Sequence, residues 1–179
     1  MFYSATNSKS ALQPLNASLL ADTDIPPPQL AGGTATPEGI IISVPHAGRA
    51  YPKTYFSQDN LAAGRSLEDF GADIIALPLA TKSQPVLIAK CCRALCDLNR
   101  PETALDPELI DHIPTSTDSI FKPHIRAGYG VIPRLSASKT PLHKRALSSD
   151  EAENILSQWH RPYHEMLTKL ISLAGQKNN

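Results

Sequence analysis

Two short runs of apolar, mostly β-branched residues constrain the fold of this chain most strongly. Residues 39–44 are Gly-Ile-Ile-Ile-Ser-Val, and residues 85–89 are Pro-Val-Leu-Ile-Ala. Runs of this length and composition are typical of strands buried on both faces of a sheet. A shorter run at residues 95–99 predicts a third strand, which Arg100 and Pro101 would end.

Helical patterns lie between and after these runs. Within residues 68–79, Phe70, Ile74 and Leu77 recur at helical spacing, and Pro78 predicts a helix end nearby. Strands that alternate with helices predict an α/β domain, with a mixed or mainly parallel sheet flanked by helices.

The clearest helix is expected near the C-terminus. Ser148 and Glu151 have the spacing of a capping box, and Ile155, Trp159 and other apolar residues recur on one face after it. Pro162 lies inside this pattern, so we expect it to kink or split the helix.

Proline and glycine indicate where the domain begins. Residues 26–37 contain four prolines and two glycines and are poor in large apolar side chains. This composition predicts a flexible or extended leader over residues 1–37, followed by one domain over residues 38–175.

Composition and charge exclude several classes of protein. The 179 residues carry a formal net charge of zero, which gives no electrostatic reason to expect nucleic acid or an anionic membrane as a partner. No apolar run approaches the length of a membrane span, and the N-terminus lacks the pattern of a secretory signal. The three cysteines, at positions 91, 92 and 96, fit neither a disulfide framework nor a zinc ribbon. Reduced thiols in a cytoplasmic protein are the simplest interpretation.

The loop after the first strand is the first candidate site. Ligands of open α/β sheets bind beyond the carboxyl ends of the strands, where His46 would lie in Pro45-His46-Ala47-Gly48. Its imidazole can bind zinc or act as an acid or base. Gly48 would let the backbone approach a ligand, and Arg49 can hold a carboxylate. The alternative is that His46 only stabilises a turn.

Two acidic and basic segments offer further candidates. Glu68 and Asp69 precede a helical pattern. One interpretation is that both acids lie at the start of that helix, where the helix dipole favours them. The other is that one of them supplies a carboxylate ligand to a metal. The segment from Arg93 to Arg100 combines guanidinium groups with Asp97 and Asn99. It can bind a substrate carboxylate, or form an internal network in which Asp97 pairs with Arg93 or Arg100.

His160 and His164 have the i, i+4 spacing of a helical metal-binding pair. Arg161 stands where such motifs carry glutamate, and Pro162 disturbs the helical geometry that the pair requires. Surface or packing histidines are therefore the preferred interpretation.

Three of these segments together resemble the N-formylglutamate amidohydrolase family. The first is Ser43-Val44-Pro45-His46-Ala47-Gly48-Arg49 with Pro52, the second is Glu68-Asp69 with Asp73, and the third is Arg93 with Asp97-Leu98-Asn99-Arg100-Pro101. Gly130-Val131-Ile132-Pro133-Arg134 and Pro162-Tyr163-His164 follow in the expected order, so the resemblance extends over residues 39–172.

The resemblance implies a zinc-dependent hydrolase with a fold similar to the zinc carboxypeptidases. Its members cleave the formamide bond of N-formyl-L-glutamate in histidine breakdown, or act on related N-acyl amino acids. By this resemblance His46 is a catalytic zinc ligand, and Asp69 or Glu68 is the carboxylate ligand. Arg100 is catalytic and binds the substrate carboxylate with Asn99, while Arg49 and Arg134 also contact substrate.

The chain departs from the family pattern at its C-terminal end. Members usually continue after the helix with a strand that carries an Asp-x-His-Ser motif, whose histidine is a further zinc ligand. No such string occurs here, so His124 or His164 would have to substitute. An uncovered sheet edge would also favour self-association as a homo-oligomer.

Three functions therefore compete. The first is hydrolysis of a small N-formyl or N-acyl amino acid by metal-activated water. The second is a binding module that keeps a carboxylate pocket without turnover. The third is a structural role, in which the exposed sheet edge pairs with another chain.

Overall fold

The computed structural model describes residues 20–21, 25–33, 40–113 and 122–175. Its centre is a three-stranded mixed sheet in the order β2-β5-β3. β2 (Gln29–Ala31) pairs antiparallel with β5 (Val86–Ile88), and β3 (Ile42–Val44) pairs parallel with β5. A second pair of strands, β1 (Leu20–Ala21) and β4 (Tyr51–Pro52), runs parallel. The predicted α/β class with a mixed sheet is confirmed.

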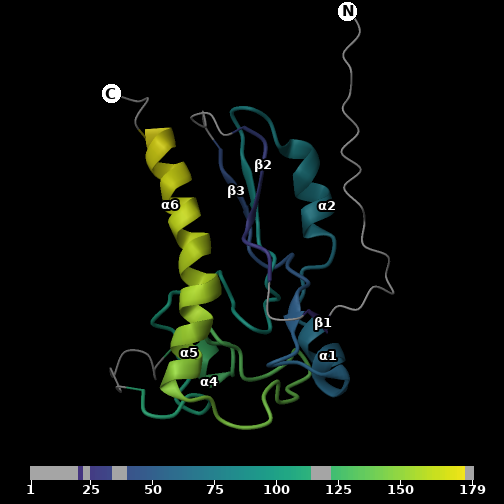
Figure 1. Ribbon diagram of the computed structural model, residues 1–179, viewed down its shortest axis with the longest axis vertical. Helices are drawn as coiled ribbons and strands as arrows, with labels where there is room; N and C mark the ends of the chain where they lie inside the picture. The colour runs from purple at the N-terminus through teal and green to yellow at the C-terminus, as the bar shows by residue number, and fades with distance from the viewer. Residues whose placement is uncertain (1–19, 22–24, 34–39, 114–121, 176–179) are drawn as a thin grey trace, which may run out of the picture.

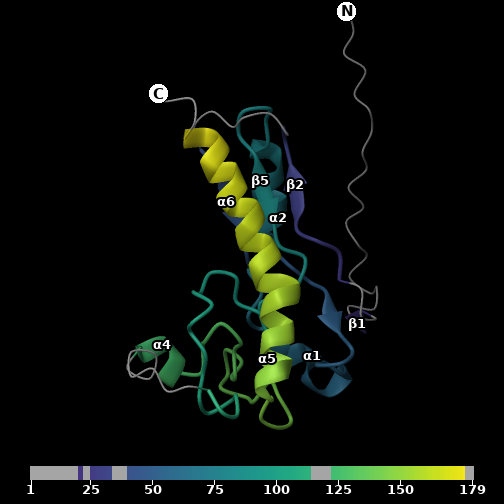
Figure 2. The same cartoon turned by 60° about the vertical axis from the view of Figure 1, so that its left-hand side comes forward.

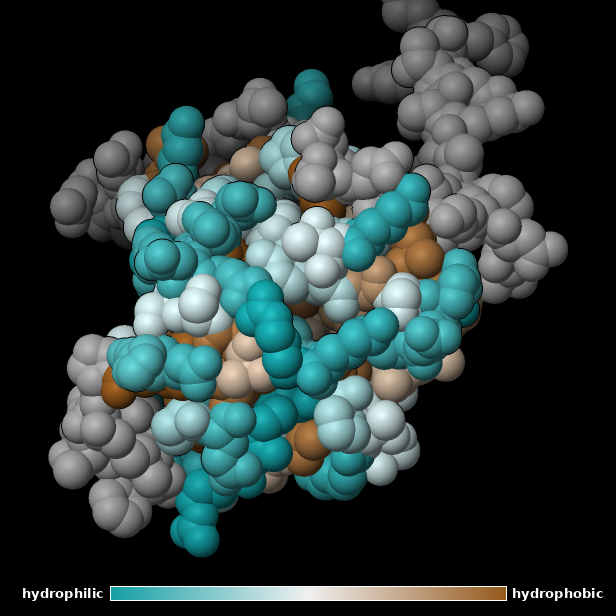
Figure 3. All heavy atoms as spheres, turned by 60° about the horizontal axis from the view of Figure 1, so that its bottom comes forward, coloured by the Kyte–Doolittle hydropathy of each residue, from teal (hydrophilic) through white to brown (hydrophobic). Residues whose placement is uncertain are grey.

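Helices cover both faces of the sheet. α2 (Ala72–Ala76), continued by the 3₁₀ turn η1 (Leu77–Leu79), lies on one side, and α6 (Arg161–Gly175) lies on the other (Figures 1 and 2). α1 (Gln58–Arg65), α4 (Pro123–Arg126) and α5 (Ser149–Ile155) lie toward the lower end in Figure 1. Hydrophilic side chains cover most of that end, and hydrophobic ones show only in small groups (Figure 3).

The central strand explains the position of the core. Val86 and Ile88 belong to a small apolar cluster that includes Ala76 of α2, whereas Leu87 belongs to a larger cluster that includes Tyr163 of α6. Alternate side chains of β5 thus face opposite layers, as the pleat of a strand requires. The prediction of a strand buried on both faces is confirmed for this run.

The other predicted strands differ from expectation. β3 is shorter than its apolar run and has an exposed Ser43, because it lies at the edge of the sheet rather than inside it. Residues 95–99 form turns, so the predicted third strand is wrong. Leu95 and Cys96 both donate their N–H groups to the Cys92 carbonyl, which closes a turn and leaves no extended segment to pair.

The apolar pattern of residues 68–79 predicts a helix that is longer and more buried than the one observed. The helix begins after Gly71, whose φ of 83° lies in the left-handed region that glycine adopts readily. Phe70 is 63% exposed and lies before α2, and Ile74 is 47% exposed and lies on the outer surface of α2.

Pro162 neither splits nor ends the C-terminal helix. A π-helical turn, η2 (Leu156–His160), joins α5 directly to α6, and Arg161 donates its N–H to the Leu156 carbonyl five residues earlier. Proline clashes with the carbonyl four residues before it and lacks an N–H. The wider π turn, which inserts a residue ahead of the proline, lets the helix continue.

Within the predicted leader, Gln29–Ala31 forms β2 and is hydrogen-bonded to the central strand. The three cysteines form no disulfide, as predicted, and all three are buried. None of the helices in the described ranges is long and apolar enough to cross a membrane.

The predicted capping box of α5 is present. The Ser148 hydroxyl accepts the Glu151 N–H at 3.1 Å, and the Glu151 carboxylate accepts the Ser148 N–H at 2.9 Å. We expect Ser148→Ala to lower the free energy of unfolding by about 1 kcal/mol, because a helix N–H loses its acceptor. Urea denaturation measures the change. Ser157→Ala, at an exposed position of η2 just after α5, is the control and should change stability by less than about 0.5 kcal/mol.

Candidate active site

His46 lies in the loop that follows the carboxyl end of β3, where the sequence places it. Its side chain is buried, and its carbonyl accepts the backbone N–H of Asp69 at 3.2 Å. Gly48 in the same loop allows a close backbone contact with residue 91, because a Cβ atom there would lie 1.9 Å from the Cys91 carbonyl oxygen. The expectation that Gly48 also lets the backbone approach a ligand stays a prediction.

Asp97 holds one nitrogen of the His46 ring. Its carboxylate is almost fully buried, and Oδ1 lies 2.8 Å from His46 Nε2. Burial alone raises the pKa of such a carboxyl, but the His46 hydrogen bond and the Arg93 charge outweigh burial and lower it. Asp97 is therefore ionised at neutral pH and only accepts hydrogen bonds. It follows that His46 Nε2 carries a proton.

Asp69 faces the other nitrogen of the same ring. Its Oδ2 lies 3.1 Å from His46 Nδ1, and its side chain is 56% exposed. Arg93 bridges the two acids, with Nε 3.1 Å from Asp97 Oδ2 and Nη1 3.7 Å from Asp69 Oδ1. His46 thus lies between a buried and an exposed carboxylate, and one guanidinium braces both.

Glu68 points away from this cluster. Its carboxylate accepts a hydrogen bond from the Tyr51 hydroxyl at 2.6 Å and pairs with Arg65 at 3.3 Å. Of the two acids that the sequence offers as metal ligands, the structure places only Asp69 beside His46.

The Asp97–Arg100 turn brings two more predicted residues to the site. Asn99 donates its N–H to Asp97 Oδ1 at 3.0 Å, and its side chain is exposed. Arg100 Nε lies 3.8 Å from Asp97 Oδ2, which is an ion pair but too long for a hydrogen bond. That buried Nε makes no hydrogen bond within the described part of the chain. Arg100 is therefore drawn toward the cluster, and its side chain remains 29% exposed.

The other two predicted substrate residues already have partners. Arg49 donates to Asp73 at 3.0 Å and stacks over Phe70. Arg134 binds Asp106 and Glu108, both at 2.9 Å. The contacts observed for Arg134 do not join it to His46, and its role in substrate binding stays a prediction.

The histidines considered as substitute ligands differ in position. His124 Nε2 is buried without a hydrogen-bond partner among the described residues, and burial followed by the nearby Arg100 charge lowers its pKa. His164 instead uses its Nε2 to bind the Leu98 carbonyl at 3.0 Å. Across the described ranges, no group of three or more His, Cys, Asp or Glu residues is placed to hold a metal ion.

His46 and Asp69 nevertheless match part of a metal site. A histidine ligand usually donates its other ring N–H to a carboxylate, which fixes the ring and the free lone pair. His46 has this arrangement, because Nε2–H faces Asp97 and Nδ1 faces Asp69. Two tetrahedral zinc ligands lie about 3.3 Å apart. The observed Nδ1–Oδ2 separation of 3.1 Å is therefore compatible with two ligands of one ion.

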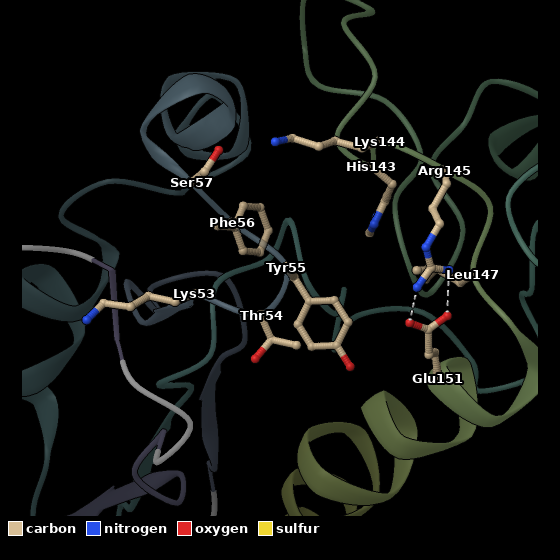
Figure 4. Close-up of a pocket in the computed structure, with 10 residues that line it drawn as sticks. All are labelled: Lys53, Thr54, Tyr55, Phe56, Ser57, His143, Lys144, Arg145, Leu147 and Glu151. Carbon is tan, nitrogen blue, oxygen red and sulfur yellow. Dashed lines mark hydrogen bonds and ion pairs between the residues drawn. The ribbon is translucent and has the colours of Figure 1, made fainter.

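Two surface cavities lie away from this cluster. One, of about 240 Å³, is lined by Tyr55, His143 and neighbouring residues (Figure 4). Within it, the Arg145 guanidinium donates two hydrogen bonds to the Glu151 carboxylate. Another, of about 480 Å³, lies along α6. Neither is lined by His46, Asp69 or Asp97.

Known proteins share this arrangement of segments. A family model described as N-formylglutamate amidohydrolase matches residues 39–178, which include every residue of the His46 cluster. The chain belongs to the N-formylglutamate amidohydrolase family. The resemblance inferred from the three sequence segments is thus confirmed.

The crystal structure of N-formylglutamate amidohydrolase from Ralstonia eutropha JMP134, at 2.00 Å resolution, has a similar fold. It is 26% identical in sequence, with a TM-score of 0.74 over 85% of this chain. The match covers 54% of the Ralstonia chain, so this chain spans about half the length of that relative. None of the curated proteins matches the sequence.

The sequence interpretation missed the role of Asp97 as the partner of His46. It considered only Arg93 and Arg100 as partners of Asp97, and both ion pairs are present. The available signal was an acid between Leu95-Cys96 and Leu98, since a carboxylate inside an apolar run must find buried donors. Which donors it finds depends on tertiary structure.

We expect the two carboxylates around His46 to differ in their effect on stability. Asp97→Asn should lower the free energy of unfolding by about 1.5–3 kcal/mol, because it weakens charged hydrogen bonds in a buried position. Asp69→Asn is the matched control and should cost less than about 1 kcal/mol, since its carboxylate is largely exposed. Urea denaturation at pH 7 compares them, and equal losses would contradict the assignment of Asp97 as the central acceptor.

Proposed function

We propose that this chain carries the substrate-binding and part of the metal-binding residues of an amidohydrolase that cleaves the formamide bond of N-formyl-L-glutamate, or of a related N-acyl amino acid. The observation that supports this most directly is the 2.8 Å contact between His46 and Asp97. These residues belong to two family segments that are 51 positions apart in the sequence. Family membership supports the reaction class, and a cytoplasmic role in histidine breakdown is proposed with it.

His46 Nδ1 and Asp69 are the residues that would hold a zinc ion, as they do not compete with the Asp97 contact. Zinc bound there would supply a Lewis acid that polarises the formyl carbonyl and activates water for attack. Catalytic zinc sites use three protein ligands, as in the His₂Glu set of carboxypeptidase A, to which the fold is proposed to be related. Among the described residues, no third His, Cys, Asp or Glu is placed with this pair to complete such a site.

The chain's own charges would bind and orient the substrate. Arg100 lies near Asp97 with a side chain that is 29% exposed, so its guanidinium can bind a substrate carboxylate through paired hydrogen bonds. The exposed Asn99 side chain lies one residue before it and can donate to the same group. Asp97 keeps the His46 ring in one orientation, and Arg93 keeps Asp69 beside it. With the substrate carboxylate bound by Arg100, the amide bond to be cleaved would lie beside His46 and Asp69.

A second candidate function is binding of an acidic amino acid without hydrolysis. It is supported by the finding that no described group of residues completes a three-ligand metal site. Calorimetry with N-formyl-L-glutamate distinguishes the two functions, because a binding module gives heat of binding and releases no formate.

His46→Ala tests the proposed reaction. With zinc supplied, the wild-type chain should release formate from N-formyl-L-glutamate, and His46→Ala should lower kcat/KM by at least about 100-fold, since it removes a ligand and the ring that Asp97 orients. His143→Ala is the control, because the His143 ring also makes a hydrogen bond, to the Pro133 carbonyl, but lies outside the cluster. An active His46→Ala variant would rule out this site.

Asp69 and Glu68 provide a separate test of the metal. We expect Asp69→Asn to weaken zinc binding by at least about 10-fold, because the amide is a poorer ligand than the carboxylate. Glu68→Gln should leave zinc affinity within about 2-fold of wild type, since Glu68 faces Tyr51 and Arg65. Zinc titration against a competing chelator measures both. If Glu68→Gln is the weaker binder, Asp69 is not the carboxylate ligand.

A further inference from the structure

The C-terminal helix contacts the segment after Asp97 at every second residue. His164 Nε2 donates to the Leu98 carbonyl at 3.0 Å, and His160 Nε2 donates to the Arg100 carbonyl at 2.9 Å. Arg161 then binds the Glu102 carboxylate. The segment and the helix run in opposite directions along this line of contacts.

The two histidine rings are oriented so that both can donate to these backbone carbonyls. They stack with centroids 4.2 Å apart and an angle of 28° between their planes. Because a carbonyl oxygen only accepts, each Nε2 must carry the proton. His160 Nδ1 is buried without a hydrogen-bond partner in the described residues, and burial lowers the His160 pKa, which favours the neutral ring.

The π turn brings His160 to this line. The extra residue in η2 (Leu156–His160) changes the helical phase between α5 and α6 immediately before His160 and Arg161. π turns occur frequently at functional sites, and here one ends at His160, the residue bound to the Arg100 carbonyl.

The same helix also holds the strand that leads to His46. Tyr163 donates its hydroxyl proton to the Leu87 carbonyl at 3.3 Å, so the Ser43 hydroxyl, 2.8 Å away, donates to Tyr163. Ser43 lies in β3, three residues before His46. Consecutive turns of one helix therefore support both segments of the site.

We propose that His160 is a positioning residue for Arg100, which it fixes through the Arg100 carbonyl so that the guanidinium stays beside Asp97 and meets the substrate carboxylate. The link to substrate rests on the proposed function. The His160 side chain contacts the backbone carbonyl of Arg100 and acts on the Arg100 guanidinium only through that contact.

Two variants separate the hydrogen bond from simple packing. His160→Gln places an amide nitrogen where His160 Nε2 donates, whereas His160→Leu keeps apolar bulk without a donor. His143→Leu is the matched control, because it removes an equivalent hydrogen bond from histidine to the Pro133 carbonyl. Each variant is assayed for hydrolysis of N-formyl-L-glutamate and, without substrate, for hydrogen exchange of the Asn99 and Arg100 amides.

We expect His160→Leu to raise KM by about 5- to 10-fold, with a smaller change in kcat, and to speed exchange at both amides by a similar factor. His160→Gln should restore both values to within about 2-fold of wild type, and His143→Leu should leave both unchanged. Wild-type exchange rates in His160→Leu, or equal losses in the Leu and Gln variants, would overturn the proposal. If the wild-type chain hydrolyses nothing, the proposed reaction fails, and the exchange rates still decide whether His160 holds the turn.

Discussion

The buried Asp97 carboxylate is the interaction on which the site depends. A charge taken out of water costs several kcal/mol unless donors surround it. Here Oδ1 accepts from His46 and from the Asn99 backbone, and Oδ2 accepts from Arg93. The need to satisfy one carboxylate therefore brings a histidine from 51 positions away to the guanidinium groups that lie close to Asp97 in the sequence. The geometry of the ring at position 46 follows from where Asp97 is buried.

The features that the sequence predicted correctly are those set by local chemistry. The central strand is continuously apolar, and the α5 cap needs only Ser148 and Glu151. The errors arise where tertiary contacts override local pattern. Residues 95–99 look like a strand by composition, yet their turn is closed by the Cys92 carbonyl and fixed by the bond from the Asp97 N–H to Val131. Phe70 and Ile74 have helical spacing, but Phe70 lies before the short helix and Ile74 lies on its exposed side.

The site could be predicted in part for the same reason. The His46 loop, the acidic pair and the Asp97–Arg100 segment are recognisable as residue strings, and the structure brings one member of each together. The choice between Glu68 and Asp69 could not be made from the sequence, because adjacent residues can face opposite sides. Tyr51 and Arg65 hold the Glu68 side chain away from the site. Asp69 stays at the site because its backbone N–H donates to the His46 carbonyl.

The charges around His46 also limit what the site can bind. Asp69 and Asp97 carry two negative charges, and Arg93 and Arg100 carry two positive charges, so the cluster with a neutral His46 is balanced. A proton on Nδ1 or a divalent cation between Nδ1 and Asp69 would each satisfy the exposed carboxylate. The divalent cation, proposed here as zinc, would leave the site with two excess positive charges. N-formylglutamate carries two carboxylates, so its charge would match the loaded site, while the unloaded cluster offers it little net attraction. Under the proposed function, metal and substrate binding would therefore strengthen one another, and Arg100 is the proposed contact for the substrate's charge.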